Sequence, residues 1–239
     1  MWKTFFVICE FLSYLIPNRK KQLYIREHML FDWKNKYKSL KSVCSNLRFK
    51  HVKIIRGGWN IGFIVDNKYV FKIAKFYDET KTINKVTREK RITDAFRNAV
   101  KIKIPKIVII KTPKFVFYRY DFIAGKNLNH LPMRIIKKYR DRFASEIAKF
   151  IYAVHNTNPI EINDLKGTNG DGWNHNDICN NVIVDTKTYK IAGIIDWEYA
   201  GYGALETEFN NCVRFSSKLR KSGILDKIKK EYYKQTKNK

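Results

Sequence analysis

One segment in the C-terminal half of the chain concentrates side chains that could do chemistry. The sequence GWNHNDICNNVIVD, residues 172–185, contains His175, Asp177 and Asn181, and Asp196 follows at the end of an apolar run. Phosphoryl transfer needs a carboxylate that orients the attacking hydroxyl, and amide and carboxylate oxygens that hold Mg²⁺ against the phosphates. Asp177, Asn181 and Asp196 supply this trio in chain order. The same residue types are also ordinary in polar surface turns.

Upstream residues could bind the phosphates of a nucleotide. Lys72 lies in the alternating segment KYVFKIAK, and Glu89 follows seventeen residues later in an expected helix. A lysine on the third strand and a glutamate on the next helix hold the α- and β-phosphates of ATP in kinase folds. The alternative for Lys72 is a solvated lysine on an edge strand. Gly57 and Gly58 in RGGWNIG would let backbone N–H groups approach a phosphate, although a plain hairpin turn also explains them.

The pattern of apolar residues predicts the elements that must position these groups. Three strand-like segments precede a helix at residues 80–97, and two further strands flank a turn at Pro113. Five strands with one helix after the third make a small antiparallel lobe. Beyond Gly125 the pattern is mainly helical, with two short strands after the Asp177 segment. We therefore expect a helical N-terminal extension, an N-lobe and a C-lobe, over residues 1–50, 51–121 and 122–239.

The N-terminal extension predicts two helices, separated by IPNRKK. The first apolar run contains Glu10, lacks an A-x-A-like cleavage site and, at about fifteen residues, is shorter than the roughly 20 needed to cross a bilayer. An amphipathic or buried helix is expected there rather than a secretion signal. The segment QLYIREHMLFDWKNKYKSL interleaves apolar and basic residues, which suits either packing on the protein or contact with an anionic membrane.

The composition indicates a folded protein with anionic partners. The chain has 239 residues, 44% hydrophobic and 15% aromatic, and a net charge of +26. Lysines are spread along the whole chain, so a general compositional drift explains the charge as well as a basic patch does. Four well-separated cysteines, with no CxxC pair, indicate neither a zinc site nor a disulfide framework. A reduced, cytoplasmic compartment is the simpler expectation.

The ordered set of motifs resembles the aminoglycoside phosphotransferase and choline kinase family, a branch of the protein-kinase-like fold that phosphorylates small-molecule hydroxyls. H-x-D followed by Asn, a short strand pair and IDWEYAG carry the resemblance. REKRITDAF resembles the family's N-lobe helix, YDFIAGKNL its hinge, and FASEIAKFIYAVHNTNP the helix before the catalytic loop. The resemblance covers roughly residues 55–210 and implies a two-lobed α+β fold.

The family resemblance implies a role for each matching residue. Asp177 would be the catalytic aspartate near the acceptor hydroxyl, and Asn181 and Asp196 would bind Mg²⁺. Lys72 would contact the phosphates of ATP and be steadied by Glu89.

Other matching residues would shape the nucleotide site and its surroundings. The backbone of Tyr120, Asp121 and Phe122 would meet the adenine, and Gly57 and Gly58 would lie near the phosphates. His175 would hold the catalytic loop in shape.

The sequence departs from the family pattern at three places. The family has four residues between the catalytic Asp and its Asn partner, whereas three precede Asn181 and two precede Asn180. A polar, glycine-rich stretch replaces the strand before His175, so Asp171 or Trp173 would either enter the acceptor site or belong to a surface loop. Only about thirty residues follow ALETEFN, which predicts short or missing acceptor-clasping helices.

The resemblance predicts an ATP- and Mg²⁺-dependent kinase of a small-molecule or glycan hydroxyl, for example on a bacterial surface glycolipid. Choline or an aminoglycoside is the alternative acceptor, since Glu198, Glu206 and Glu208 could face a cation, although they could equally cap helices. A protein kinase is disfavoured by the absence of H-R-D, D-F-G and A-P-E motifs. A non-catalytic basic protein that binds membrane or nucleic acid is the alternative of another class. We expect a cytoplasmic protein with peripheral membrane contact.

Overall fold

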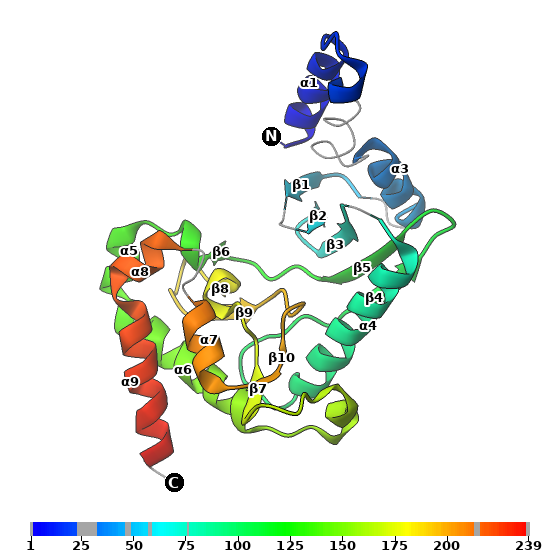
Figure 1. The fold of residues 1–239 in the computed structure, drawn as a ribbon. Helices are drawn as coiled ribbons and strands as arrows, with labels where there is room; N and C mark the ends of the chain where they lie inside the picture. Colours follow the sequence, from blue (N-terminus) through cyan, green and yellow to red (C-terminus); the bar gives the residue numbers. More distant parts are fainter. Residues whose placement is uncertain are drawn as a thin grey trace. The chain divides into compact units, whose positions relative to one another are not determined.

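The computed structural model describes residues 2–22, 33–45, 49–56, 59–75, 77–212 and 216–237, and Figure 1 labels its helices and strands. The chain forms two compact units. The N-terminal unit contains residues 1–87 and 107–122, and the C-terminal unit contains residues 88–106 and 123–239. Helix α4 (Glu79–Phe96) begins in the first unit and ends in the second.

The N-terminal unit contains the predicted five-stranded antiparallel sheet. Its strand order is β1-β2-β3-β5-β4. The strands are β1 (Val52–Arg56), β2 (Asn60–Val65), β3 (Tyr69–Ala74), β4 (Val108–Lys111) and β5 (Val116–Asp121). Each pairing is antiparallel, and the one helix of the motif, α4, follows the third strand. The predicted fold class is therefore confirmed in this unit.

Turn chemistry and strand alternation explain the register of this sheet. Asp66 and Asn67 both have positive φ, 49° and 52°, which Asn and Asp adopt at low cost and which a tight hairpin turn requires. The turn pairs Phe63 of β2 with Phe71 of β3. Both rings are fully buried in the core of the unit, so a register shift of one residue would expose them to solvent.

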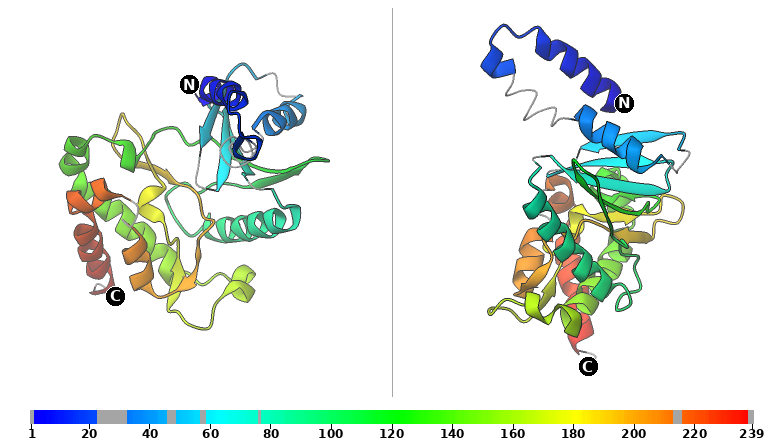
Figure 2. Two further views of the ribbon diagram at one scale, coloured as in Figure 1. Left: turned by 45° about the horizontal axis from the view of Figure 1, so that its top comes forward. Right: turned by 90° about the vertical axis from the view of Figure 1, so that its right-hand side faces the viewer.

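A helical N-terminal extension precedes the sheet, as predicted. Helix α1 spans Trp2–Tyr14 and α3 spans Trp33–Val43. Trp33 and Leu40 of α3 are buried in the core of the sheet, and the right-hand view of Figure 2 shows α3 beside the strands. The interleaved segment QLYIREHMLFDWKNKYKSL spans residues 22–40, of which residues 23–32 lie outside the described residues and the rest after them belongs to α3. The described helices include none long and apolar enough to cross a membrane.

The C-terminal unit is mainly helical. Its helices are α5 (Met133–Lys138), α6 (Arg140–Asn156), α7 (Leu205–Cys212), α8 (Ser217–Ser222) and α9 (Ile224–Lys237). Its strands are β6 (Lys126–Asn127), β7 (Gly172–Asn174), β8 (Val182–Val184), β9 (Ile191–Ile194) and β10 (Gly201–Gly203), with 3-10 turns η1 (Leu128–His130), η2 (Ile160–Leu165) and η3 (Ile178–Asn180). Helices α6 and α9 run side by side through the core (Figures 1 and 2).

The periodicity of α6 predicts its buried face. Phe143, Ile147, Ile151 and Val154 lie about one turn apart in the sequence, and all four are buried. The predicted single helix is interrupted at Tyr139, where α5 ends and α6 begins.

The strand before His175 is present, which corrects the expectation that a polar loop replaces it. Strand β7 pairs antiparallel with β10. Its glycines serve close packing: a Cβ on Gly172 would lie 2.4 Å from the His155 carbonyl oxygen, and one on Gly170 would lie 2.6 Å from the Cα of Gly203. The glycine-rich composition therefore reflects backbone contacts that leave no room for side chains.

Candidate active site

The Asp177 loop joins β7 to β8 and is closed by hydrogen bonds between its own side chains. Asn180 Nδ2 donates to Asp177 Oδ1 at 2.5 Å, and Asn181 Nδ2 donates to Asp177 Oδ2 at 3.0 Å. Asn181 Nδ2 also donates to the Asp177 carbonyl oxygen at 3.0 Å. Both carboxylate oxygens of Asp177 are thus oriented by amides from the turn η3 and its C-terminal cap.

His175 fixes the entrance of this loop from a buried position. Its ring contacts the Trp197 ring at a centroid distance of 4.9 Å, and its Nε2 lies 3.1 Å from the Ile195 carbonyl oxygen. The Asp177 backbone N–H donates to His175 Nδ1 at 3.3 Å. With Nδ1 accepting, Nε2 carries the proton and donates to Ile195. The ring therefore ties the Asp177 loop to the segment that carries Asp196.

Glu208 of α7 holds the same loop from the other side. Its Oε2 accepts the backbone N–H of His175 at 2.5 Å and that of Asn176 at 2.9 Å. Burial raises the pKa of Glu208 to about 7, although these two N–H groups and that of Ile178 favour the ionised form. The position of Glu208 leaves no access for an acceptor, so this residue belongs to the framework of the loop.

The two candidate metal-binding asparagines differ in how their side chains are used. Asn180 Nδ2 binds Asp177, and its Oδ1 accepts Asn129 Nδ2 at 2.6 Å, so both ends are engaged. Asn127 Nδ2 donates to the Asn180 carbonyl at 2.6 Å. Asn181 donates only through Nδ2, and within the described part of the chain its Oδ1 accepts no hydrogen bond. A metal ion binds the amide oxygen, which Asn181 has available.

Asp196 follows β9 in a left-handed backbone conformation, with φ 64°. The Ile195 N–H donates to the Asn181 carbonyl at 3.1 Å, which places this segment beside the start of β8. Glu89 of α4 is 3% exposed, and its Oε1 accepts the Trp197 N–H at 3.2 Å. Asp196 is thus flanked on both sides by backbone groups with fixed partners.

The electrostatics of Asp177 reflect both its burial and its neighbours. Burial raises the pKa of Asp177 above its ordinary value, the amides of Asn180 and Asn181 oppose the shift, and the charges of Asp196 and Glu198 add to it. Asp177, Asp196 and Glu198 therefore form a local concentration of negative charge in a basic protein. Such a site suits a cation.

Two cysteines beside this loop are bonded, which corrects the expectation of no disulfide. Cys179 of η3 and Cys212, the last residue of α7, form a disulfide with a Cα to Cα distance of 4.9 Å. Both are fully buried. Their separation of 33 residues in the sequence gave no indication that they meet. The disulfide joins the turn that follows Asp177 to the helix that carries Glu208.

In the N-terminal unit, Lys72 is on the central strand β3, not on an edge. It is 6% exposed, and its Nζ lies 5.6 Å from the Tyr118 ring centroid and 5.8 Å from that of Tyr120. Lys72 pairs with Tyr118 in the β3–β5 register, which puts the cation over the aromatic face of β5. The solvated edge-strand alternative is therefore wrong. Glu89 belongs to the other unit, so its predicted pairing with Lys72 stays a prediction.

The predicted adenine-binding residues lie at the end of β5. Tyr120 is 4% exposed and Asp121 is exposed at the last strand position. The Phe122 N–H donates to the Lys68 carbonyl at 2.7 Å, so this donor is already used within the sheet. Gly57 and Gly58 lie outside the described residues.

Some of the residues considered for the acceptor site have structural roles. Trp173 is 1% exposed in the C-terminal core, so its expected alternative place in the acceptor site is wrong. Asp171 accepts the Leu205 N–H at 3.1 Å and lies 3.4 Å from His155. Glu206 binds Lys229 at 3.5 Å on an exposed surface. The charge of Glu198 acts on Asp177.

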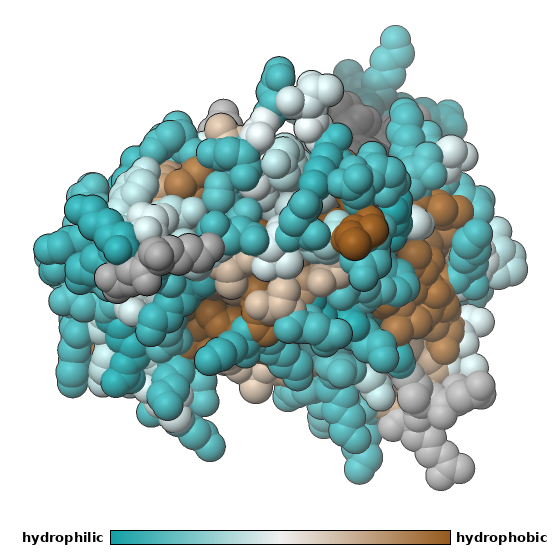
Figure 3. Space-filling model, turned by 90° about the horizontal axis from the view of Figure 1, so that it is seen from below, coloured by the Kyte–Doolittle hydropathy of each residue, from teal (hydrophilic) through white to brown (hydrophobic). Residues whose placement is uncertain are grey.

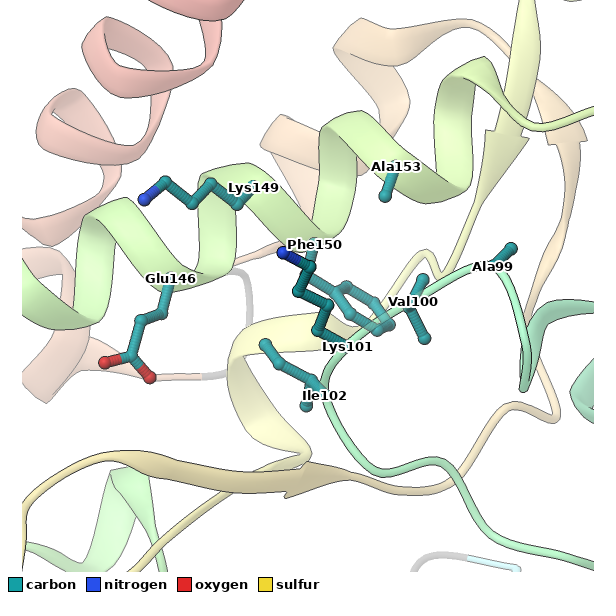
Figure 4. Close-up of a pocket in the computed structure, with 8 residues that line it drawn as sticks. All are labelled: Ala99, Val100, Lys101, Ile102, Glu146, Lys149, Phe150 and Ala153. Atoms are coloured by element: carbon teal, nitrogen blue, oxygen red, sulfur yellow. The ribbon is translucent and has the colours of Figure 1, made fainter.

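A cavity of about 390 Å³ lies between α6 and the loop after α4 (Figure 4). Its lining residues include Lys101, Ile102, Glu146, Lys149 and Phe150. None of the predicted site residues lines it, and Glu146 accepts the Ile191 N–H at 2.8 Å. The cavity and the Asp177 loop are therefore formed by different residues.

Several residues that build the loop were missed from the sequence. Glu208 was considered only as a cap or an acceptor contact, and Asn127 and Asn129 were not considered. The available signal was the N-x-N spacing of Asn127 and Asn129 around the apolar Leu128. Two asparagines with this spacing in a turn can place their side-chain amides on the same side. The tie from Glu89 to the Trp197 backbone had no sequence signal.

Comparisons with known proteins address the family and the fold. Residues 161–234 match the model of the phosphotransferase enzyme family. The fold is similar to that of ADP-bound aminoglycoside phosphotransferase APH(2'')-Ib, with 14% identity, a TM-score of 0.63, and coverage of 82% of this chain and 81% of that one. No curated protein matches the sequence.

Two further solved structures extend the comparison. The streptomycin-ATP complex of APH(2'')-IIa has 15% identity and a TM-score of 0.61, with coverage of 82% and 81%. Macrolide 2'-phosphotransferase MphH from Brachybacterium faecium has 9% identity and a TM-score of 0.58, with coverage of 82% of each chain. The chain thus has the protein-kinase-like fold of these phosphotransferases, and the predicted resemblance to the aminoglycoside phosphotransferase family is confirmed.

Proposed function

We propose that the chain is an ATP- and Mg²⁺-dependent phosphotransferase that acts on a hydroxyl of a small molecule or glycan. The observation that carries the proposal is the Asp177 carboxylate, held by two amides in a loop beside Asp196. A carboxylate oxygen of Asp177 receives the proton of the acceptor hydroxyl as that hydroxyl attacks the terminal phosphate. A base held in one orientation, with its pKa raised toward neutrality, is suited to this task.

Asn181 and Asp196 are the residues that would hold Mg²⁺. They provide one amide oxygen and one carboxylate, and nucleotide phosphates commonly complete such a site. Among the described residues there is no cluster of three or more His, Cys, Asp and Glu that could hold a metal ion, which fits a site that depends on the nucleotide for its other ligands. When bound, Mg²⁺ neutralises charge on the phosphate oxygens. Asn180 is the weaker candidate because Asn129 occupies its oxygen.

Lys72 is proposed to contact the nucleotide phosphates. Its position over two tyrosine rings keeps the ammonium group in one place on the central strand. The lysine ammonium group is a compact point charge, which suits contact with a nucleotide phosphate. Tyr120 and Asp121 remain the proposed neighbours of the adenine, and Gly57 and Gly58 of the phosphates.

Two classes of acceptor are proposed, one anionic and one cationic. A hydroxyl on a sugar of a bacterial surface glycolipid suits the net charge of +26, because such acceptors are anionic. A cationic acceptor, choline or an aminoglycoside, is the second candidate and is favoured by Glu198, whose charge acts on Asp177. The solved neighbours include complexes with streptomycin and gentamicin. Glu198→Gln separates the two: it should raise KM about tenfold for a cationic acceptor and leave an anionic one unchanged.

The test is phosphate transfer from ATP, with Mg²⁺, to a panel of choline, aminoglycosides and lipooligosaccharide. Asp177→Asn should lower transfer by about 10²- to 10⁴-fold and keep nucleotide binding. Asp196→Asn should weaken Mg²⁺-dependent nucleotide binding. Asp226→Asn makes the same change at an exposed position of α9 and should have no effect. A wild-type protein that binds no nucleotide, or an Asp177→Asn variant with full activity, would refute the proposal.

A further inference from the structure

Helix α1 carries an exposed apolar face. Six of its described apolar side chains are between 47% and 67% exposed: Val7, Ile8, Phe11, Leu12, Tyr14 and Leu15, the last just past the helix end. At about 100° per residue these six positions fall within an arc of about 160°. Ser13, on the other side of the helix, is 2% exposed, and Cys9 packs toward the core of the sheet. The helix therefore has one face against its own unit and one apolar face outward.

This concentration of exposed apolar residues is unusual for the chain. Elsewhere in the part of the chain that the structure describes, exposed large apolar residues occur one at a time in the sequence: Trp59, Val108, Ile160, Tyr199 and Tyr233. The face of the molecule in Figure 3 is mostly hydrophilic, with hydrophobic residues in a few patches. A contiguous apolar face of this size on a protein surface marks an interaction site.

The charges beside α1 identify the partner. Arg19, Lys20 and Lys21 follow the apolar face directly and are all exposed. Basic residues next to an apolar helical face are typical of helices that lie in the interface of an anionic bilayer. Tyr14 stands at the edge of the arc, where an aromatic ring with a polar end suits the headgroup region. A second copy of the chain is a poor partner, because each copy carries a net charge of +26.

We propose that α1 docks the protein on the surface of an anionic phospholipid bilayer. Phe11 and Leu15, near the centre of the arc, enter the acyl boundary, and Arg19, Lys20 and Lys21 contact the headgroups. At 13 residues, α1 is too short to cross the membrane and lies along it. This docking does not depend on phosphate transfer, and it would hold the protein at the surface on which a glycolipid acceptor lies.

The test is sedimentation of the full chain with vesicles. Binding should be strong to phosphatidylglycerol mixed with phosphatidylcholine, weak to phosphatidylcholine alone, and reduced by salt. The double substitution Phe11→Ser and Leu15→Ser should weaken binding about 100-fold, since each buried side chain contributes about tenfold or more. Ile160→Ser removes an apolar residue that is 88% exposed in the C-terminal unit, and should bind as the parent does.

The triple substitution of Arg19, Lys20 and Lys21 to Gln should also weaken binding to anionic vesicles about 100-fold, because each charge contributes roughly fivefold to the affinity. Far-UV circular dichroism and nucleotide binding establish that each variant is folded. Unchanged vesicle binding by the Phe11 and Leu15 variant, or equal binding to both vesicle types, would overturn the proposal. So would a dimer in size-exclusion chromatography that the same variant dissociates. Vesicle binding by a protein that transfers no phosphate would refute the enzymatic proposal alone.

Discussion

The Asp177 loop and the strand of Lys72 place their charged groups by different means. Asp177 is oriented by side-chain amides and by a loop whose backbone is bound to Glu208, a residue 31 positions later. Lys72 is placed by strand register and by the aromatic residues opposite. A network depends on many specific partners, whereas register depends on the apolar pattern of a whole strand. Single substitutions should therefore damage the loop more than the strand.

The largest effect is expected at Glu208. Glu208→Ala leaves two buried backbone N–H groups without an acceptor, which should lower the free energy of unfolding by about 4 kcal/mol. Glu208→Gln should be tolerated, because both N–H groups bind the same oxygen and an amide oxygen can accept them. Denaturant unfolding measures both variants. An Ala variant as stable as the Gln variant would mean that the loop is not held by Glu208.

The Glu208 carboxyl also predicts a pH dependence. Its folded-state pKa, about 7, lies above the ordinary value of 4.5, so the folded state binds the proton more tightly in this window. The contribution of Glu208 to the free energy of unfolding is largest below pH 4.5, where the carboxyl is protonated in both states. The free energy of unfolding should fall as the pH rises from 4.5 to 7, by up to about 3 kcal/mol. The Gln variant, which mimics the protonated form, should lack this decline.

The next largest effect is expected for the Cys179–Cys212 disulfide. Closing a loop of 33 residues should stabilise the fold by about 3 to 4 kcal/mol through the entropy of the unfolded chain. Unfolding with and without dithiothreitol measures this, and Cys212→Ser should remove the response. Cys9→Ser, at a free cysteine, should keep it. The disulfide leaves two free thiols, Cys9 and Cys44, so four free thiols by mass spectrometry in the air-oxidised protein would contradict the prediction.

The strand of Lys72 predicts a separation of stability from activity. Lys72→Met keeps the approximate volume of the side chain, so the fold should be retained, while kcat/KM falls about 100-fold. Lys36→Met is the matched control in the same unit. It removes the 2.6 Å hydrogen bond from Lys36 Nζ to the Lys75 carbonyl, and should cost about 1 to 3 kcal/mol of stability with activity retained. The reverse pattern would contradict a nucleotide role for Lys72.

The smallest effect is expected at the rim of the loop. Asn129→Ala removes the hydrogen bond to Asn180 Oδ1 and should lower stability by about 1 kcal/mol and activity a few-fold. Asn158→Ala, at an exposed position before η2, is the control. A loss of activity as large as that of Asp177→Asn would show that Asn180 is the metal ligand, with Asn129 orienting it.

Strand and helix patterns made the framework predictable, and contacts between distant residues did not. Alternating apolar residues and the turn at Asn67 gave the five strands, because period and turn chemistry are local. KGTNGDGWN was interpreted as a polar loop because its local composition is polar and rich in glycine. Its glycines instead make room for residues far away in the sequence: Gly170 packs against Gly203, and Gly172 packs against His155. Asp177, Asn181 and Asp196 could be chosen as candidates from spacing alone. Glu208 and Cys212 could not be given roles, because only the folded chain brings α7 to the loop.

The left-handed backbone at Asn176 and Asp196 bears on how this protein can evolve. At such positions Asn and Asp are tolerated and most other residues are disfavoured. Codons for Asp and Asn differ by a single base, so a point mutation at Asp196 can remove the charge and leave the backbone undisturbed. If Asp196 binds Mg²⁺ as proposed, a descendant that folds normally but has lost its phosphotransferase activity is one mutation away.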